Sequence, residues 1–215
     1  NLKGEVEIEG RSLKIKNASG DFAGNMVKNI NGQISNMKSD APTLKLNGIL
    51  NGDLQRIIDN ANKSPVEKWL KNFTTDMTGK GLADLDLFLT IDLKNFQNSD
   101  VFGKLTLKNN EISLKDFLPQ LTIHKGEVIF SKNKLVELDL SGKSLGGNFS
   151  ISEREDNGIK NLNLAMTGAF DSNEFIKWLF KVKNPSKSNT FKGLIDYKLD
   201  IDFQNNTLSV LGFSD

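Results

Sequence analysis

The residues from Val101 to Ile151 form a series of short segments in which apolar and polar side chains alternate. Side chains two residues apart lie on the same face of a β-strand, so the apolar ones are expected to share one face of a sheet. The pairs Asn109-Asn110, Lys125-Gly126 and Gly146-Gly147 separate the segments and are typical of tight hairpin turns. The pattern therefore predicts a meander of antiparallel strands with one apolar face.

The same alternation predicts strands on both sides of this region. We count about 15 strands in all, more than the roughly 10 that an open twisted sheet tolerates before it curls or splits. The sheet is therefore expected to curl into an elongated, taco-like groove with its apolar face inward, or to fold over as a β-sandwich that seals its own core. The alternation favours a mainly β protein but leaves both forms open.

Three stretches change to the helical period and predict short amphipathic helices. The first covers residues 53–61, the second begins at Ser64-Pro65 and reaches Phe73, and the third begins at Asp171 and reaches Val182. Their aromatic side chains pack against the sheet in the simplest interpretation, and the alternative is a helical lid over it. These aromatic residues are Trp69, Phe73, Phe175 and Trp178.

The order of the predicted elements repeats along the chain. Alignment of Leu82 with Leu194 places Asp84 on Asp196 and Leu87 on Leu199. We therefore infer two diverged copies of one β-rich unit, about residues 1–98 and 99–215, within a single elongated domain that spans residues 1–215.

Composition excludes several classes of function. A net charge of +1 gives no general field to attract nucleic acid, and no apolar run approaches the roughly 20 residues of a transmembrane helix. The chain has no cysteine and one histidine, His124, which alternation places toward solvent. The aspartates at 84, 86, 92, 200 and 202 lie along extended segments, where they do not form a calcium loop. We therefore expect no enzyme, no metal site and no cofactor.

Several stretches resemble the bacterial AsmA-like proteins, in the order that this family shows, and together they cover most of the chain. They are LKGEVEIEGRSLKIKNASGDFAG, LKLNGILNGDLQRIIDNANKSPVEKW, MTGKGLADLDLFLTIDL, FGKLTLKNNEISL with LPQLTIHKGEVIFS, and TFKGLIDYKLDIDFQNNTLSVLGFSD. The resemblance implies a periplasmic segment of a larger protein, anchored in the inner membrane of a Gram-negative bacterium by parts outside this chain. Such proteins are thought to help move phospholipids toward the outer membrane through a β groove.

In such a groove, phospholipid acyl chains would contact the apolar residues of the alternating segments. The expected lining is Leu85, Leu87, Leu89, Ile91, Leu105, Leu107, Ile112, Leu114, Leu121, Ile123, Val128, Phe130, Val136, Leu138, Leu140, Phe149, Ile151, Leu162, Leu164, Tyr197, Leu199 and Ile201. The alternative is a β-sandwich without lipid cargo that serves as a spacer or as a docking surface for protein partners in the cell envelope.

Overall fold

The computed structural model describes residues 2–22, 24–63, 74, 76–114, 119–132, 134–153, 163–181, 193–204 and 207–213. The strands in these ranges are β1 (Leu2–Glu9), β2 (Ser12–Phe22), β3 (Asn25–Ile34), β4 (Thr43–Asp53), β5 (Met77–Lys80), β6 (Leu82–Asp92), β7 (Asp100–Leu114), β8 (Leu121–Ser131), β9 (Lys134–Ser144), β10 (Gly147–Glu153), β11 (Asn163–Asp171), β12 (Leu194–Gln204) and β13 (Thr207–Phe213). The α-helices are α1 (Leu54–Asn62) and α2 (Ser172–Phe180), and η2 (Phe96–Asn98) is a single 3₁₀ turn.

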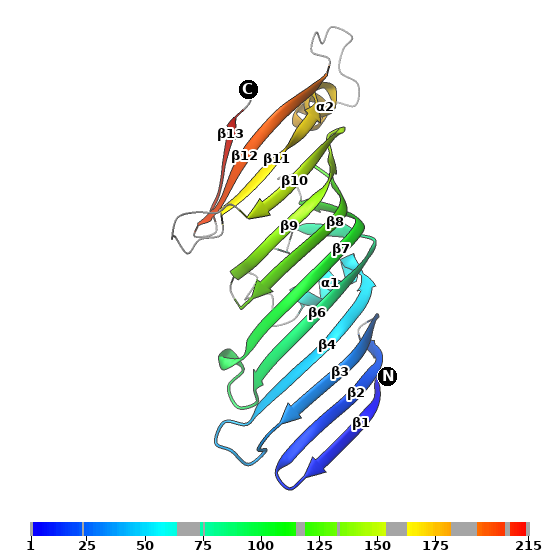
Figure 1. Ribbon diagram of the computed structural model, residues 1–215, viewed down its shortest axis with the longest axis vertical. Coiled ribbons are helices and arrows are strands. Elements are labelled where there is room, and N and C mark those ends of the chain that lie inside the picture. Colours follow the sequence, from blue (N-terminus) through cyan, green and yellow to red (C-terminus); the bar gives the residue numbers. More distant parts are fainter. Residues whose placement is uncertain are drawn as a thin grey trace.

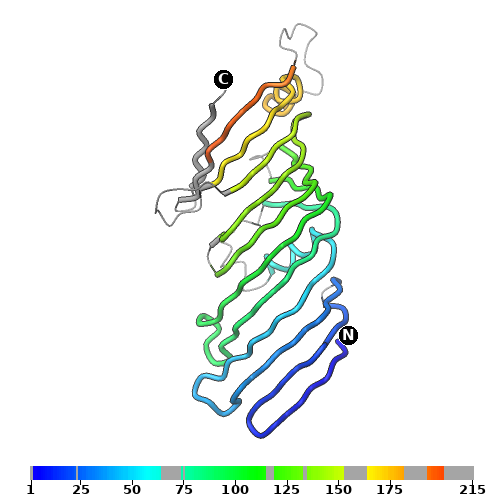
Figure 2. Tube along the Cα trace, viewed as in Figure 1, coloured from blue at the N-terminus to red at the C-terminus, as the bar shows by residue number. Residues whose placement is uncertain are grey.

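All thirteen described strands belong to one open sheet, and each hydrogen-bonded pair of strands is antiparallel (Figure 1). The strands follow the chain order from β1 to β13, except that β5 lies off this path and pairs with β7. The sheet is long and twisted, with the N-terminal and C-terminal strands at opposite ends (Figure 2). The prediction of a mainly β chain is confirmed. The described strands adopt the single sheet rather than a sandwich of two sheets.

Strand β7 is the longest and organises the middle of the sheet. Its first part pairs with β6 and its last four residues pair with β5. The chain changes direction between β5 and β6 at Gly81, where φ is +96°. The Asn110 side chain holds this bend, because its Nδ2 donates to the carbonyl oxygens of Lys80 (3.1 Å) and Leu82 (3.0 Å). The backbone N–H of Lys108 donates to Asn110 Oδ1 at 2.7 Å.

The turns predicted at Asn109-Asn110 and Lys125-Gly126 are wrong, since β7 and β8 continue through both positions. Asn109 instead adopts a left-handed conformation with φ +56° inside β7. Asparagine tolerates this conformation, so it allows a bulge without ending the strand. Asn17 and Asn29 interrupt β2 and β3 in the same way, with φ of +49° and +52°. The sequence pattern counts about 15 strands chiefly because it divides β7 and β8.

Two of the three predicted helices are present in the described ranges, and the second, at residues 64–73, lies outside them. Helix α1 buries Leu54, Ile57 and Ile58, the apolar stripe that the helical period predicts. These three side chains join one hydrophobic core with residues of β6 to β11. Gly79 of β5 permits the contact, because a Cβ atom at this position would lie 2.6 Å from Leu54 Cγ.

Candidate functional site: the apolar face of the sheet

The strand register brings apolar side chains of every strand from β1 to β12 onto one face of the sheet. Residues directly opposite each other on antiparallel strands share a face. The pairs Leu46–Leu89, Leu85–Leu105 and Leu105–Val128 link β4 to β8. The pairs Val128–Leu138, Leu140–Ile151, Ile151–Met166 and Met166–Leu199 continue the face to β12. We call this surface the apolar face.

The bulges keep the apolar face continuous. In β8, Ile123 pairs with Gly142 and Gly126 pairs with Leu140, and both partners lie on the same face of β9. His124 and the next residue therefore both project to the opposite side, where they are exposed. The prediction that His124 faces solvent is confirmed.

Most of the expected lining residues lie on the apolar face, but they differ in burial. Nine of them are buried in the protein core: Leu85, Leu107, Ile112, Leu121, Ile123, Leu140, Phe149, Ile151 and Leu164. Ten others are half-buried: Leu87, Leu89, Ile91, Leu105, Leu114, Val128, Phe130, Leu138, Tyr197 and Leu199. Helix α1 lies over the middle of this face, so the middle is more enclosed than an open groove would be.

Three expected lining residues have a different position. Val136 is exposed, because the register shifts in β9 and pairs Leu135 with Phe130 in its place. Leu162 lies outside the described residues, and for Ile201 only the place in β12 is described.

The N-terminal end of the apolar face is the open part. Leu2, Val6 and Ile8 of β1 face this side and are 57%, 62% and 65% exposed. Apolar residues of β2 to β4 that continue the face are half-buried, namely Leu13, Ile15, Ile30, Ile34, Leu44, Leu46 and Leu50. None of these residues is in the expected lining. The signal that includes them is simple alternation within each strand, as in Val6 and Ile8, Leu13 and Ile15, or Leu44 and Leu46.

Helix α2 covers the other end of the face with aromatic side chains. The ring of Phe175 stacks on Phe170 at a centroid distance of 4.7 Å and also contacts Trp178 at 5.9 Å. Phe170 contacts Tyr197 at 5.7 Å, and burial raises the pKa of the Tyr197 hydroxyl to about 12. Phe175 therefore packs against the sheet, Trp178 is 36% exposed, and the helical lid stays a prediction. Trp69 and Phe73 lie outside the described residues.

The opposite face of the sheet carries charged side chains that are exposed or half-buried. Lys16 contacts Glu7 at 2.7 Å, and this hydrogen bond lowers the pKa of the Glu7 carboxyl and raises that of Lys16. Further along the sheet, Lys104 contacts Glu127 at 3.0 Å. Exposed ion pairs of this kind contribute little to stability, so their main effect is to keep this face in water.

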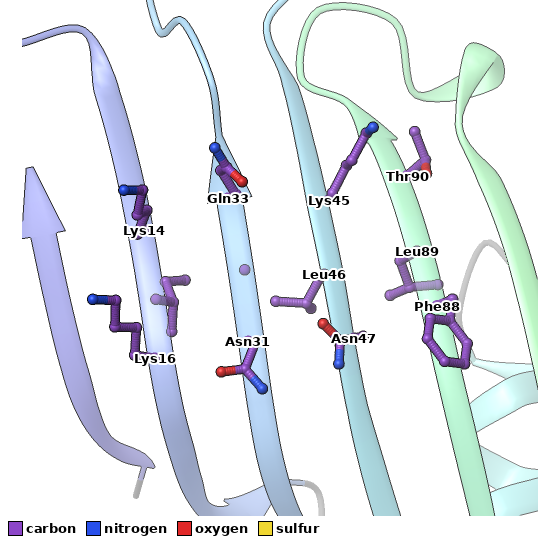
Figure 3. A pocket seen from close by; sticks show the side chains of 12 residues that line it. Lys14, Lys16, Asn31, Gln33, Lys45, Leu46, Asn47, Phe88, Leu89 and Thr90 are labelled. Carbon is purple, nitrogen blue, oxygen red and sulfur yellow. The ribbon is translucent and has the colours of Figure 1, made fainter. Parts of the chain in front are cut away.

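A shallow depression of about 400 Å³ crosses β2, β3, β4 and β6 (Figure 3). Its lining forms two rows, with Lys14, Gln33, Lys45 and Thr90 in one and Lys16, Asn31, Asn47 and Phe88 in the other, and with Leu46 and Leu89 between them. The depression is thus lined both by residues of the apolar face and by residues of the charged face.

The described strands thus form one open sheet with a charged face and an apolar face, and the family comparison places the chain among the AsmA-like proteins. The family model described as YhdP protein matches residues 1–215, so this chain belongs to the YhdP family. It is not a known enzyme family. No curated protein and no solved structure matches the chain. No helix in the described ranges is long and apolar enough to cross a membrane.

Proposed function

We propose that this chain is a lipid-conduit segment that holds phospholipid acyl chains on its apolar face. In this proposal it lies in the periplasm, as part of a protein anchored in the inner membrane, and it supports phospholipid transport between the inner and outer membranes. Membership of the YhdP family supports an envelope role.

The observation that carries the proposal is the continuous apolar face without a second sheet over it among the described strands. Apolar surface that remains open to water is unfavourable, and large contiguous patches usually mark a binding site. Transfer of an acyl chain onto such a surface gains about 0.8 kcal/mol for each buried CH₂ group. A few methylene groups in contact with the open part between β1 and β6 are therefore enough for transient binding.

The charged face is the reason for proposing an amphipathic lipid as the cargo. The head group of a phospholipid must stay in water while its tails are buried. A sheet that is apolar on one side and carries ion pairs such as Lys104–Glu127 on the other presents both environments at its rim. The arrangement suits an amphipathic cargo better than a wholly apolar one.

The test is lipid analysis of the purified 215-residue chain by mass spectrometry. The variant Leu46→Glu with Leu89→Glu places two charges on opposed, half-buried positions of the apolar face. We expect the wild-type chain to carry phospholipid and this variant to lose most of it. An acyl chain bound at these positions would remove water from the two introduced carboxylates, which costs free energy. The control Asn47→Glu with Thr90→Glu changes the adjacent positions of the charged face and should keep the lipid. Absence of lipid from the wild type, or equal lipid in both variants, would contradict the proposal.

A second candidate is a structural or protein-docking module without lipid cargo. The burial of the central residues favours it, because Leu107 and Ile123 are 1% and 0% exposed and form part of a closed core. This candidate predicts that Leu46→Glu with Leu89→Glu leaves the envelope phospholipid balance of cells unchanged. The conduit proposal predicts that the same variant disturbs this balance while the control variant does not.

A further inference from the structure

The middle of the apolar face is covered by α1, which is part of the chain itself (Figure 1). Leu54, Ile57 and Ile58 of α1 are 1%, 7% and 4% exposed, and they share one hydrophobic core with buried residues of β6 to β11. Leu107 and Ile123 of this core are almost completely enclosed. Three branched aliphatic side chains thus occupy surface on which an acyl chain would otherwise lie. Because a protein core is close-packed, α1 and an acyl chain exclude each other there.

Only one side of α1 is packed against the strands, and we call this arrangement the closed position of α1. The apolar stripe faces the sheet, whereas Arg56 on another side of the helix is exposed. Two backbone N–H groups also tie the helix to the bend between β5 and β6. Leu54 donates to the carbonyl oxygen of Gly81 at 2.9 Å, and Gly79 donates to Gln55 Oε1 at 2.8 Å. A nine-residue helix with one packed side has few contacts to break, which is typical of the parts of a protein that open without unfolding the rest.

The closed position depends on the absence of a side chain at Gly79. A Cβ atom there would lie 2.6 Å from Leu54 Cγ and 3.0 Å from Ile58 Cδ1. The backbone of Gly79 does not adopt the positive φ that Gly81 adopts, so its conformation does not require glycine. The close approach of α1 is therefore the reason for glycine at this position. A single methyl group is enough to oppose the closed position.

Helix α2 shows that strand pairing does not require a helix in such a position. Both helices follow a capping aspartate, Asp53 before α1 and Asp171 before α2. In α2 only Ser172 is buried, and counted from the caps it is equivalent to Leu54 of α1. Strand β11 nevertheless pairs with β12 along its whole length. The sheet therefore keeps its strands together where a helix covers it less completely.

We propose that α1 is an autoinhibitory helix that competes with phospholipid acyl chains for the middle of the apolar face. The closed position leaves the N-terminal part of the face open to an acyl chain, and lipid enters the middle when α1 moves away. The effect is reciprocal, since lipid in the middle disfavours the closed position by the same free energy by which the closed position disfavours the lipid. The inference rests on the proposed function, because the competing ligand is the acyl chain.

The test compares a chain in which α1 is locked with one in which the closed position is weakened. The lock is a disulfide in Leu54→Cys with Gly79→Cys, and the natural chain has no cysteine to compete with it. Because Leu54 Cγ lies 2.6 Å from the Cβ position of residue 79, the two Cβ atoms are no more than about 4 Å apart, within the range of disulfides. The weakened chain is Gly79→Ala, in which the added methyl group opposes the helix.

The readout is photolabelling by phosphatidylethanolamine with a diazirine near the end of one acyl chain, and mass spectrometry maps the labelled residues. We expect label on β2 to β4 in every chain. Label on β7 to β9 should be low in the oxidised lock and should rise at least about fivefold when the disulfide is reduced. It should also be higher in Gly79→Ala than in the wild type.

The matched control is a disulfide in Asn47→Cys with Phe88→Cys, which joins directly opposed positions of β4 and β6 on the charged face and leaves α1 free. Oxidation of this control should not change the labelling, and circular dichroism establishes that each variant is folded. Equal labelling of β7 to β9 in the oxidised and reduced lock, or no increase in Gly79→Ala, would overturn the inference while label on β2 to β4 still supports the proposed function. Absence of label from the whole apolar face would contradict both.

Discussion

Asp53 and Asp171 occupy equivalent places in the sheet. Each ends a strand, caps the helix that follows, and pairs in register with a leucine of the next strand, Leu82 for Asp53 and Leu194 for Asp171. The glycine before each leucine has a positive φ, and its carbonyl oxygen accepts from the first residue of the helix, at 2.9 Å in α1 and 3.2 Å in α2. The sequence alignment of Leu82 with Leu194 thus corresponds to a shared local structure. The division into copies at residues 1–98 and 99–215 stays a prediction.

The two capping aspartates should contribute unequally to stability. Asp53 accepts one backbone hydrogen bond, from Arg56, whereas Asp171 accepts two, from Asn173 and Glu174. Replacement of either by alanine should lower the free energy of unfolding by about 1 kcal/mol, with the larger loss at Asp171. Urea unfolding measures both changes. Asp40→Ala, at an exposed position in the β3–β4 connection, is the control and should have no effect.

Gly79 should not tolerate a side chain. A Cβ atom there would lie 2.6 Å from Leu54 Cγ and 2.7 Å from its Cδ2, so α1 would have to move away from the sheet. We expect Gly79→Ala to lower the free energy of unfolding by about 1–3 kcal/mol. The double variant Gly79→Ala with Leu54→Ala should lose less unfolding free energy than the sum of the losses in the two single variants, because the shorter side chain at position 54 relieves the clash. Additive costs would show that Gly79 and Leu54 do not interact as described.

Asn110 should be essential for the bend between β5 and β6. Its side chain is 0% exposed and makes the three hydrogen bonds described above. Asn110→Ala leaves two carbonyl oxygens and one N–H without this partner, at a cost of about 3 kcal/mol. Thermal unfolding provides the measurement. The exposed Asn47→Ala serves as the comparison, and an equal loss of stability there would argue against the role of Asn110.

The turn after β6 should make stability depend on pH. The backbone N–H groups of Asn95 and Lys94 and the side chain of Asn98 donate to Asp92, and these bonds lower the pKa of its carboxyl from 3.8. Because the pKa is lower in the folded state, the stabilisation is complete above the unfolded pKa and is lost as pH falls through the folded value. In Asp92→Asn this pH dependence should be absent. The measurement is the difference in unfolding free energy between wild type and variant across the acid range, which should shrink as pH falls. A constant difference would exclude the effect.

Strand alternation was a reliable guide where strands are regular and an unreliable one at bulges. The apolar positions of β6 and of the first half of β7 alternate without interruption, and the register confirms that they share a face. At Asn17, Asn29 and Asn109 the chain takes a left-handed conformation, so two successive residues project to the charged side. A turn and a bulge use the same residue types, which is why the sequence pattern does not separate them.

The local properties of this chain follow from its sequence, because alternation, helical period and capping residues depend on near neighbours. They give the mainly β character, the helices α1 and α2 with their capping aspartates, and the presence of an apolar face. Only the tertiary structure decided that all the described strands join one sheet, that β5 and β6 share β7, and that α1 covers the middle of the face. These features arise from contacts between residues distant in sequence, such as Leu54 with Gly79 and Asn110 with Lys80. No local pattern encodes such pairings, because each depends on where the intervening chain returns to the sheet.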